Sequence, residues 1–302
     1  MGAENLRGIV LMLISMALFA VEDMFLKWVA MRIPAGEVLF VAGLSSTLIF
    51  STLALREGQS LFGRGLWHPA VIARNLGEML GSITYIIALT LAPLATVSAI
   101  LQAMPLVATM AAALFMGAAV GWRRWTAIVA GFIGVVLVIQ PGAEGFNPAS
   151  LLVVPTVAML ALRDLATRRV PESFSTTLVA AWGMMSIAVL GLTMMAWTWL
   201  VDGALPVVPD RPETLALLGA IVFGSAGYAA VVAAARTGEV SVVAPFRYAR
   251  LLFAIVIGIL VFNEWPNALS LLGAAIIILS GLYSFARERT RARALPLTPA
   301  SG

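Results

Sequence analysis

The sequence predicts an all-α integral membrane protein with ten transmembrane helices, arranged as two inverted five-helix repeats around a central cavity. Of 302 residues, 61% are hydrophobic and 11% are charged, and the mean hydropathy is +0.99. An ordinary soluble domain is about half apolar and a quarter charged, so a water-soluble globule would lack the polar surface to cover this chain. An internal repeat, described below, supplies the second observation.

Chain-breaking residues divide the apolar sequence into ten expected spans, each near the roughly 20 residues that a membrane requires. Proline and glycine separate the first two spans at Ile33-Pro34-Ala35-Gly36, begin the third at His68-Pro69 and end the fifth at Gln140-Pro141-Gly142. Leu205-Pro206 and Arg211-Pro212 separate the seventh span from the eighth. The expected spans are residues 7–30, 36–55, 69–91, 95–116, 122–140, 149–169, 175–200, 213–235, 240–262 and 266–286.

Arginine placement predicts that both termini are cytoplasmic, because cytoplasmic loops carry an excess of basic residues. With the N-terminus inside, only Arg32 and Arg211 fall in outer loops. We therefore expect a multi-pass protein of a bacterial-type inner (plasma) membrane. The cytoplasmic segments then hold Arg7, Arg56, Arg64, Arg123, Arg124, Arg168, Arg169, Arg236, Arg287, Arg289, Arg291 and Arg293.

The chain resembles itself at a shift of 141 to 143 residues. The matches keep their order: Asp23-xxx-Lys27 with Asp164-xxx-Arg168, Gly81–Tyr85 with Gly224–Tyr228, Val97-Ser98 with Val240-Ser241, and Trp122 with Trp265. The expected units are a first repeat over residues 1–142, a second over 143–287 and a basic cytoplasmic tail over 288–302. Because each repeat has five spans, the second enters the membrane from the opposite side, a design that recurs in secondary transporters.

Several classes of chemistry are excluded by composition. The chain has no cysteine, one histidine (His68) and one lysine (Lys27), which no phosphate-binding GxxxxGK[ST] motif surrounds. We therefore expect no metal, no other cofactor and no ATP hydrolysis by this chain. The pI near 10.1 reflects arginines at the membrane face, so no nucleic-acid partner is expected.

Two stretches carry a resemblance to a known family. They are Ala92–Leu106, with its counterpart Gly238–Pro245, and Asn263-Glu264-Trp265-Pro266 followed by Leu272–Gly281. With ten spans in inverted halves, the chain resembles the EamA-type transporters of the drug/metabolite transporter superfamily, and among them most the YddG-type exporters of amino acids, aromatic ones included. The family often has a Gly-Glu pair at the end of each half's fourth helix. Glu264 keeps this acid, whereas the first half has Val120-Gly121.

The resemblance implies export of small metabolites by alternating access, with amino acids as the expected substrates, and no enzymatic activity. The bilayer is the other expected partner, and the oligomeric state, a monomer included, stays open. Other branches carry nucleotide-like metabolites, vitamins or S-adenosylmethionine, sometimes inward. A lipid flippase is a further alternative. A membrane enzyme acting on lipid-linked substrates is disfavoured because the chain lacks a His or Cys cluster.

Charged residues within the spans are the first candidates for function, because each costs roughly 2.5–3.5 kcal/mol in the membrane and usually faces a cavity or a partner. Asp23 and Lys27 lie one helical turn apart, as do Asp164 and Arg168, so each pair is expected to be either a structural ion pair or a gate. The candidates for gating or coupling are Glu22, Asp23, Lys27, Glu78, Arg163, Asp164 and Arg168.

Two of these acids have further alternatives. Glu22 and Arg163 occupy equivalent places in the two repeats and would be able to pair across the halves. Glu78, one turn after Arg74, lies between Gly77 and Gly81, which favour a close helix contact. A proton-coupling role for Glu78 is the alternative, because burial favours the neutral carboxyl.

Substrate binding is expected at Arg250, about ten residues into its helix and therefore near mid-membrane. Its counterpart in the first repeat is Val107, so fold symmetry does not require an arginine there. A guanidinium suits a carboxylate, and the alternative is a structural partner such as Glu78. The full set of expected substrate-binding residues is Arg250, Arg247, Tyr85, Gln102, Trp182, Tyr228 and Tyr248.

Overall fold

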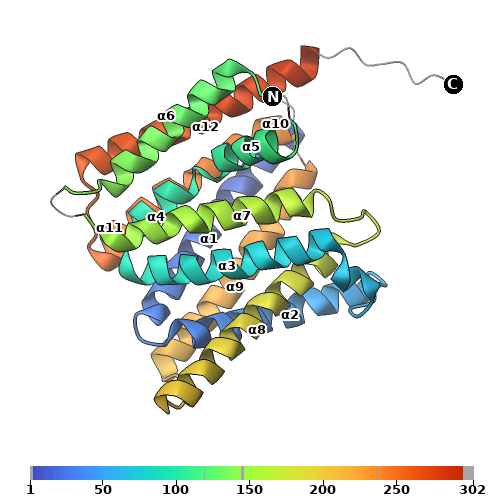
Figure 1. Cartoon of the computed structure of the whole chain (residues 1–302), viewed down its shortest axis with the longest axis vertical. Helices are drawn as coiled ribbons and strands as arrows, with labels where there is room; N and C mark the ends of the chain where they lie inside the picture. The colour runs from blue at the N-terminus through green and yellow to red at the C-terminus, as the bar shows by residue number, and fades with distance from the viewer. Residues whose placement is uncertain (1–2, 119, 144–145, 238, 295–302) are drawn as a thin grey trace.

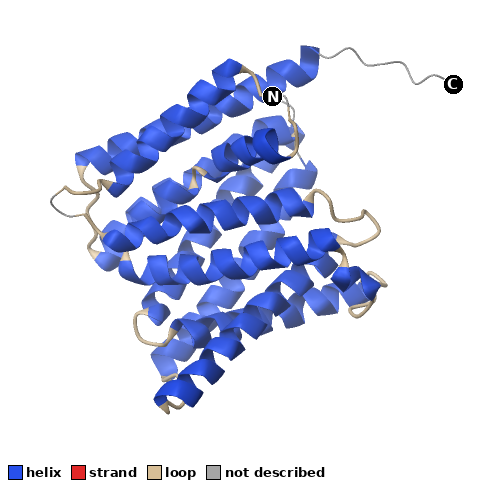
Figure 2. Cartoon of the chain, in the orientation of Figure 1, coloured by secondary structure: helices blue, strands red, loops and turns tan. Residues whose placement is uncertain are grey.

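The computed structural model describes residues 3–118, 120–143, 146–237 and 239–294. These residues form helices joined by short loops and contain no strand (Figure 2). Nine helical stretches among them are long and apolar enough to cross a membrane. The remaining expected span, α3, has 23 residues and carries Arg74 and Glu78. The predicted all-helical membrane fold is confirmed.

The first half has its elements close to the expected positions. His68 begins α3, since its Nδ1 accepts a hydrogen bond from the Ala70 amide and Pro69 supplies the first helical residue. Gln140 ends α6 in the left-handed conformation, with φ of 53°. The elements are α1 (Ala3–Ala30), α2 (Ala35–Arg56), the 3-10 helix η1 (Arg64–Trp67), α3 (Pro69–Leu91), α4 (Leu94–Leu101), α5 (Met104–Phe115) and α6 (Trp122–Ile139).

The second half follows the same plan. Ser175 caps α8 by accepting a hydrogen bond from the Leu178 amide. The last helix continues to Ala294, past the expected end of the repeat at 287, and residues 295–302 of the expected tail lie outside the described chain. The elements are η2 (Pro148–Leu152), α7 (Val153–Thr167), α8 (Thr176–Asp202), α9 (Arg211–Thr237), α10 (Val240–Val243), η3 (Ala244–Tyr248), α11 (Ala249–Phe262) and α12 (Ala268–Ala294).

The fourth span of each half is broken, although the sequence predicts single helices over 95–116 and 240–262. In the first half, α4 ends at Leu101 and α5 starts at Met104 with Pro105 in its first turn. In the second half, Pro245 lies in the 3-10 segment η3. Proline lacks the amide proton that a continuous helix would use, which explains both interruptions. The breaks meet, because Gln102 Nε2 donates to the Arg247 carbonyl at 3.2 Å.

The closest helix pairs each join one helix of the first half to one of the second. They are α2 with α8, α1 with α9, α6 with α12, and α3 with α7. Figure 1 shows α6 and α12 along one edge of the bundle and α2 and α8 along the other. Replacing each helix by its repeat counterpart leaves the first and third pairs unchanged and exchanges the other two. The helix packing therefore follows the relation that two inverted halves require.

Glycines allow the close approach of the two edge pairs. A Cβ atom at Gly191 of α8 would lie 2.4 Å from the Phe40 amide nitrogen of α2, and one at Gly134 of α6 would lie 2.7 Å from the Gly273 carbonyl of α12. Small residues at such contacts are the usual way in which membrane helices come close, because lipid provides no hydrophobic drive for association.

We expect Gly191→Val to destabilise the bundle. The added side chain would meet backbone, which cannot move aside as a flexible side chain can. Overpacking costs about 1–3 kcal/mol, and at about 2–4 °C per kcal/mol the unfolding midpoint in detergent should fall by about 5–10 °C. Gly63→Ala is the control, because nothing lies within 4 Å of its Cβ position. Equal unfolding midpoints for Gly191→Val and Gly63→Ala would contradict the close packing of α2 against α8 at Gly191.

Candidate functional site

One polar cluster closes the bundle at the end that carries the α1–α2 and α11–α12 connections. Lys27 is 3% exposed, and its Nζ lies 2.6 Å from both Glu264 Oε1 and the Ala92 carbonyl. Glu264 Oε2 accepts the amide of Leu94, the first residue of α4, at 2.7 Å, a favourable place for an anion. This Lys27 cluster (Lys27, Ala92, Leu94 and Glu264) ties α1 and α4 to the α11–α12 connection.

A second cluster lies one turn before Lys27 on α1. The Arg250 guanidinium contacts both oxygens of Asp23, with Nη2 at 2.7 Å from Oδ2 and 2.8 Å from Oδ1. The Tyr85 hydroxyl donates to the same carboxylate, whose side chain is 1% exposed. This Asp23 cluster (Asp23, Tyr85 and Arg250) joins α1, α3 and α11, and the Phe19 ring lies 5.4 Å from the guanidinium.

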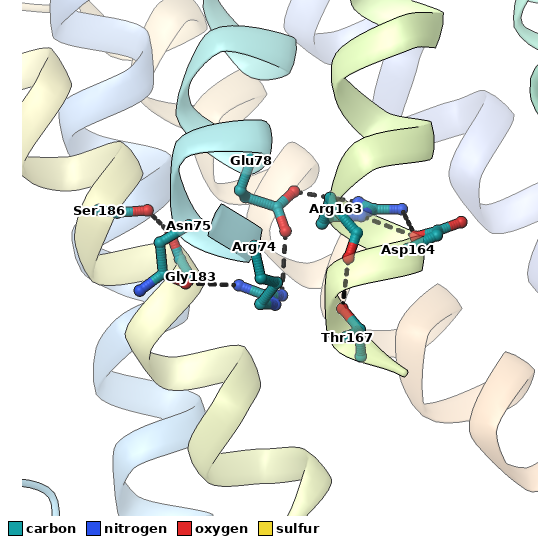
Figure 3. A network of polar contacts seen from close by, with 8 residues as sticks. All are labelled: Arg74, Asn75, Glu78, Arg163, Asp164, Thr167, Gly183 and Ser186. Atoms are coloured by element: carbon teal, nitrogen blue, oxygen red, sulfur yellow. Dashed lines mark hydrogen bonds and ion pairs between the residues drawn. The ribbon is translucent and has the colours of Figure 1, made fainter. Parts of the chain in front are cut away.

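A third cluster joins α3 to α7 (Figure 3). Glu78 lies between two arginines, at 3.0 Å from Arg74 Nη2 and 3.0 Å from Arg163 Nη1. Arg163 also contacts Asp164 at 2.8 Å. Arg74 bonds Asn75 and lies against α8 at Gly183, where a Cβ atom would be 1.7 Å from Nη1. We refer to Arg74, Glu78, Arg163 and Asp164 as the Glu78 cluster.

Most of these pairs differ from those that the sequence suggests, although Arg74 and Glu78 form the pair one turn apart on α3. Lys27 bonds Glu264 and not Asp23, and Arg250 bonds Asp23 and not Glu78. Arg163 bonds Glu78 and its neighbour Asp164, and the described residues show no hydrogen bond or ion pair between Arg163 and Glu22. Arg168 is exposed, and the described chain gives its side chain no bond to Asp164. Apart from Arg74 with Glu78 and Arg163 with Asp164, the partners come from helices distant in sequence, which spacing along one helix does not identify.

The other expected binding residues are dispersed. Trp182 donates to the Leu61 carbonyl at 2.9 Å and packs on Phe174, in a separate cluster near the α2–α3 loop. The Tyr248 hydroxyl is buried and has no hydrogen-bond partner. Arg247 is exposed, and within the described residues its guanidinium forms no hydrogen bond or ion pair. Its charged neighbours are Asp164, Arg163 and Arg250, which places it between the Asp23 and Glu78 clusters.

Two hollows are relevant to binding. One of about 140 Å³ is lined by α1, α2, α8 and α9 and includes Glu22 and Tyr228. The other, of about 710 Å³, lies between α3, α5 and α7 and has almost wholly apolar walls, with His68 and Arg169 as its polar members. Within the described residues no group of three or more His, Cys, Asp or Glu side chains would hold a metal ion.

We expect the Lys27 cluster to contribute to stability as a unit. Lys27→Met should cost about 3 kcal/mol, because it leaves the Glu264 carboxylate, which is 20% exposed, without its cation. The double variant Lys27→Met/Glu264→Gln should recover part of that loss. Chemical denaturation in detergent would give a coupling free energy of about 0.5–3 kcal/mol, whereas additive effects would contradict the pairing.

We expect Glu78 and Asp164, two acids of the Glu78 cluster, to contribute differently to the stability of the fold. Glu78→Gln leaves the buried Arg74 without a carboxylate and removes one of the two that Arg163 contacts, so it should cost about 3–5 kcal/mol of stability. Asp164→Asn should cost about 1 kcal/mol or less, because the Asp164 side chain is 38% exposed and that of Glu78 is 6% exposed. The same denaturation experiment compares the two variants, and a neutral Glu78→Gln would show that the cluster does not stabilise the fold.

Comparison with known proteins gives consistent matches. The model of the EamA-like transporter family matches residues 6–140 and again 147–285. An S-adenosylmethionine uptake transporter of Rickettsia conorii is 26% identical over 94% of each chain. A riboflavin transporter of Vibrio cholerae is 30% identical over 65% of this chain and 63% of its own. A pseudopaline exporter of Pseudomonas aeruginosa is 23% identical over 90% of this chain and 94% of its own.

A solved crystal structure supports the fold. It superposes with a TM-score of 0.60 and 19% identity, covering 97% of this chain and 99% of its own. The named relatives carry S-adenosylmethionine, riboflavin or pseudopaline, so the finer likeness to exporters of aromatic amino acids is not confirmed. With both of its halves matched by the family model, this multi-pass membrane protein belongs to the EamA-like transporter family.

Proposed function

We propose that this protein is a secondary transporter of S-adenosylmethionine or a similar amphoteric metabolite with an amino-acid group, moved by alternating access. Relatives named for S-adenosylmethionine uptake, from four Rickettsia species, align over 93–94% of this chain. S-adenosylmethionine carries a carboxylate, an ammonium and a sulfonium beside an aromatic base. The proposal thus keeps the expected amino-acid recognition and replaces an aromatic side chain by a nucleoside. Export, the direction expected from the sequence, stays a prediction.

The observation that carries the proposal is the position of Arg247. This arginine lies in η3, where the second half's fourth span is broken, and Gln102 from the other broken span bonds its carbonyl. Broken helices of this kind form the binding sites of several transporter folds. A guanidinium without a hydrogen-bonded partner, placed between two polar clusters, suits a substrate carboxylate.

The closed end of the bundle supports an alternating mechanism. Lys27 and Glu264 join the two halves there, so this contact would have to open for the substrate to pass. Gly121 stands where the first half would hold the counterpart of Glu264. The opposite end therefore lacks this carboxylate, and the two gates differ in chemistry although the helices are related by the repeat.

Lipid is the second candidate substrate, favoured by the apolar hollow between α3, α5 and α7. Its walls include Leu114, Phe115 and Leu162, which are exposed apolar side chains. An acyl chain would fit such a lining, whereas a polar metabolite would not. Flux of a fluorescent phospholipid between leaflets, measured in the same vesicles, distinguishes this alternative.

We expect saturable flux of labelled S-adenosylmethionine in liposomes that contain the purified protein. Arg247→Gln should lower kcat/KM about 10- to 100-fold, because a hydrogen bond to a charged group contributes about 1.5–3 kcal/mol. Arg211→Gln, at an exposed helix start, is the matched control and should leave flux unchanged. Loading the vesicles inside or outside gives the direction.

Phenylalanine and riboflavin are assayed in parallel with S-adenosylmethionine. Flux of phenylalanine without flux of S-adenosylmethionine would overturn the proposed substrate in favour of aromatic amino acids. Flux of riboflavin alone would favour the vitamin branch of the family.

A further inference from the structure

We infer that the hollow of about 140 Å³ between α1, α2, α8 and α9 is a binding pocket for an onium group, meaning a sulfonium or a fully methylated ammonium. The inference rests on the proposed function, because it assigns to this pocket the cationic part of the transported substrate. It concerns a different place from Arg247, which lies in η3 and does not line the pocket.

Glu22 is the one charged side chain that lines the pocket. Within the described residues its carboxylate forms no hydrogen bond or ion pair, whereas its neighbour Asp23 binds Arg250. A Cβ atom at Gly224 would lie 2.3 Å from Glu22 Oε1, so the carboxylate is seated against the backbone of α9. An anion within a membrane bundle is costly and usually has a partner. The pocket therefore offers a carboxyl group without a bonded cation, and this group would carry its charge when a cation occupies the pocket.

Other titratable groups nearby do not supply that cation. From α1, Asp23 adds a second negative charge, and Arg250 of α11 is held by Asp23 in a two-oxygen contact. From α9, Tyr228 lines the pocket with its ring and hydroxyl. The residues that α2 and α8 contribute to the lining are not titratable. Around Glu22 there is thus one arginine, Arg250, for two acidic side chains, Glu22 and Asp23.

Aromatic rings form the other side of the pocket. Phe50 of α2 and Tyr228 of α9 meet edge to face, with ring centroids 4.8 Å apart. Phe19 lies one turn before Glu22 on α1, and its ring already lies close to the Arg250 guanidinium. Aromatic rings around a carboxylate attract cations, and enclosures of this type bind quaternary ammonium groups.

The remaining lining is mostly apolar. Beside Glu22 its polar members are Ser46, Ser225 and Tyr228, and the other eight lining residues carry no polar side-chain group. A metal ion or a primary ammonium would need several of these oxygens to replace its water. An onium group donates no N–H or O–H hydrogen bond and loses less on entering an apolar lining. With a water occupying about 30 Å³ of liquid volume, 140 Å³ has room for the four or so heavy atoms of such a group.

The repeat does not provide a second copy of this pocket. The counterpart of Glu22 is Arg163, a cation that bonds Glu78 and Asp164. The onium pocket is thus a feature of one side of the pseudo-symmetric bundle, as a single substrate site requires.

Isothermal titration of the purified, detergent-solubilised full chain tests the inference with a pair of ligands that differ in one charge. S-adenosylmethionine has the sulfonium, and S-adenosylhomocysteine has a neutral thioether in its place. The unmodified protein should bind the sulfonium compound about 10-fold or more tightly than the thioether. Choline, which carries only the onium group, should compete with S-adenosylmethionine.

Single-residue variants test which side chains cause the preference for the sulfonium compound over the thioether. Glu22→Gln should reduce the ratio of the two affinities to about one and leave the thioether affinity unchanged, because only the charged ligand uses the carboxylate. Glu22→Asp should restore part of the ratio, and Phe50→Leu should lower it. Glu4→Gln, an exposed acid on the same helix, is the matched control. A ratio that survives Glu22→Gln in a variant that elutes as folded protein would overturn the inference.

Failure of the inference and failure of the proposed function give different results. Transport of S-adenosylmethionine with equal affinity for the thioether would retain the function and remove the onium pocket. Binding of choline that depends on Glu22, without binding or flux of S-adenosylmethionine, would retain the pocket and remove the proposed substrate. The absence of binding by all three ligands would overturn both.

Discussion

The pairing of buried charges across the two halves is the interaction on which this structure depends. Lys27 with Glu264, Asp23 with Arg250, and Glu78 with Arg163 each join a residue of the first half to one of the second. Each pair has one buried side chain, Lys27, Asp23 or Glu78, and loss of its partner leaves a buried charge, which costs far more than the pair itself contributes. The three contacts therefore fix how the halves meet.

The same charges also break the symmetry that the helices keep. α1 packs on α9 as α7 packs on α3, which is the geometry that allows two inverted halves to exchange conformations. The residues at equivalent positions of the two repeats nevertheless differ: Glu22 corresponds to Arg163, Arg250 to Val107 and Glu264 to Gly121. The symmetry of the backbone allows two related conformations of the bundle. The differences between equivalent side chains give a single binding site and different side chains at its two ends.

The sequence predicts the spans well, because they depend on local composition. The helix α3, over Pro69–Leu91, is predicted to the residue, since a proline and a loop bound it. The broken fourth spans are missed because Pro105 and Pro245 lie within apolar stretches that read as continuous helices. Proline in those stretches was the signal that would have located the breaks.

The site is predicted less completely, for a physical reason. Residues that lie close on one helix are four apart, and this spacing suggested Asp23 with Lys27. The partners that the fold provides are 227 and 237 residues away in sequence, Arg250 for Asp23 and Glu264 for Lys27. Composition alone does not tell which helix face meets which, so Trp182 was grouped with residues from which the structure separates it.

The ionisable side chains that have no bonded partner connect the fold to the proposed transport. Of the ten ionisable groups in and beside the three clusters, the described structure bonds eight into pairs or networks and leaves one acid, Glu22, and one cation, Arg247, without a bond. The proposed substrate has one group for each of them, a carboxylate for Arg247 and an onium group for Glu22.

Closure of the bundle around the empty site would remove water from a cation, Arg247, and from an acid, Glu22, that both lack a bonded partner, which is unfavourable. Closure around the loaded site would not carry this cost. The equilibrium between the two conformations therefore shifts by the difference in binding free energy between them. On this view the unpaired charges are what couples substrate binding to the movement of the halves.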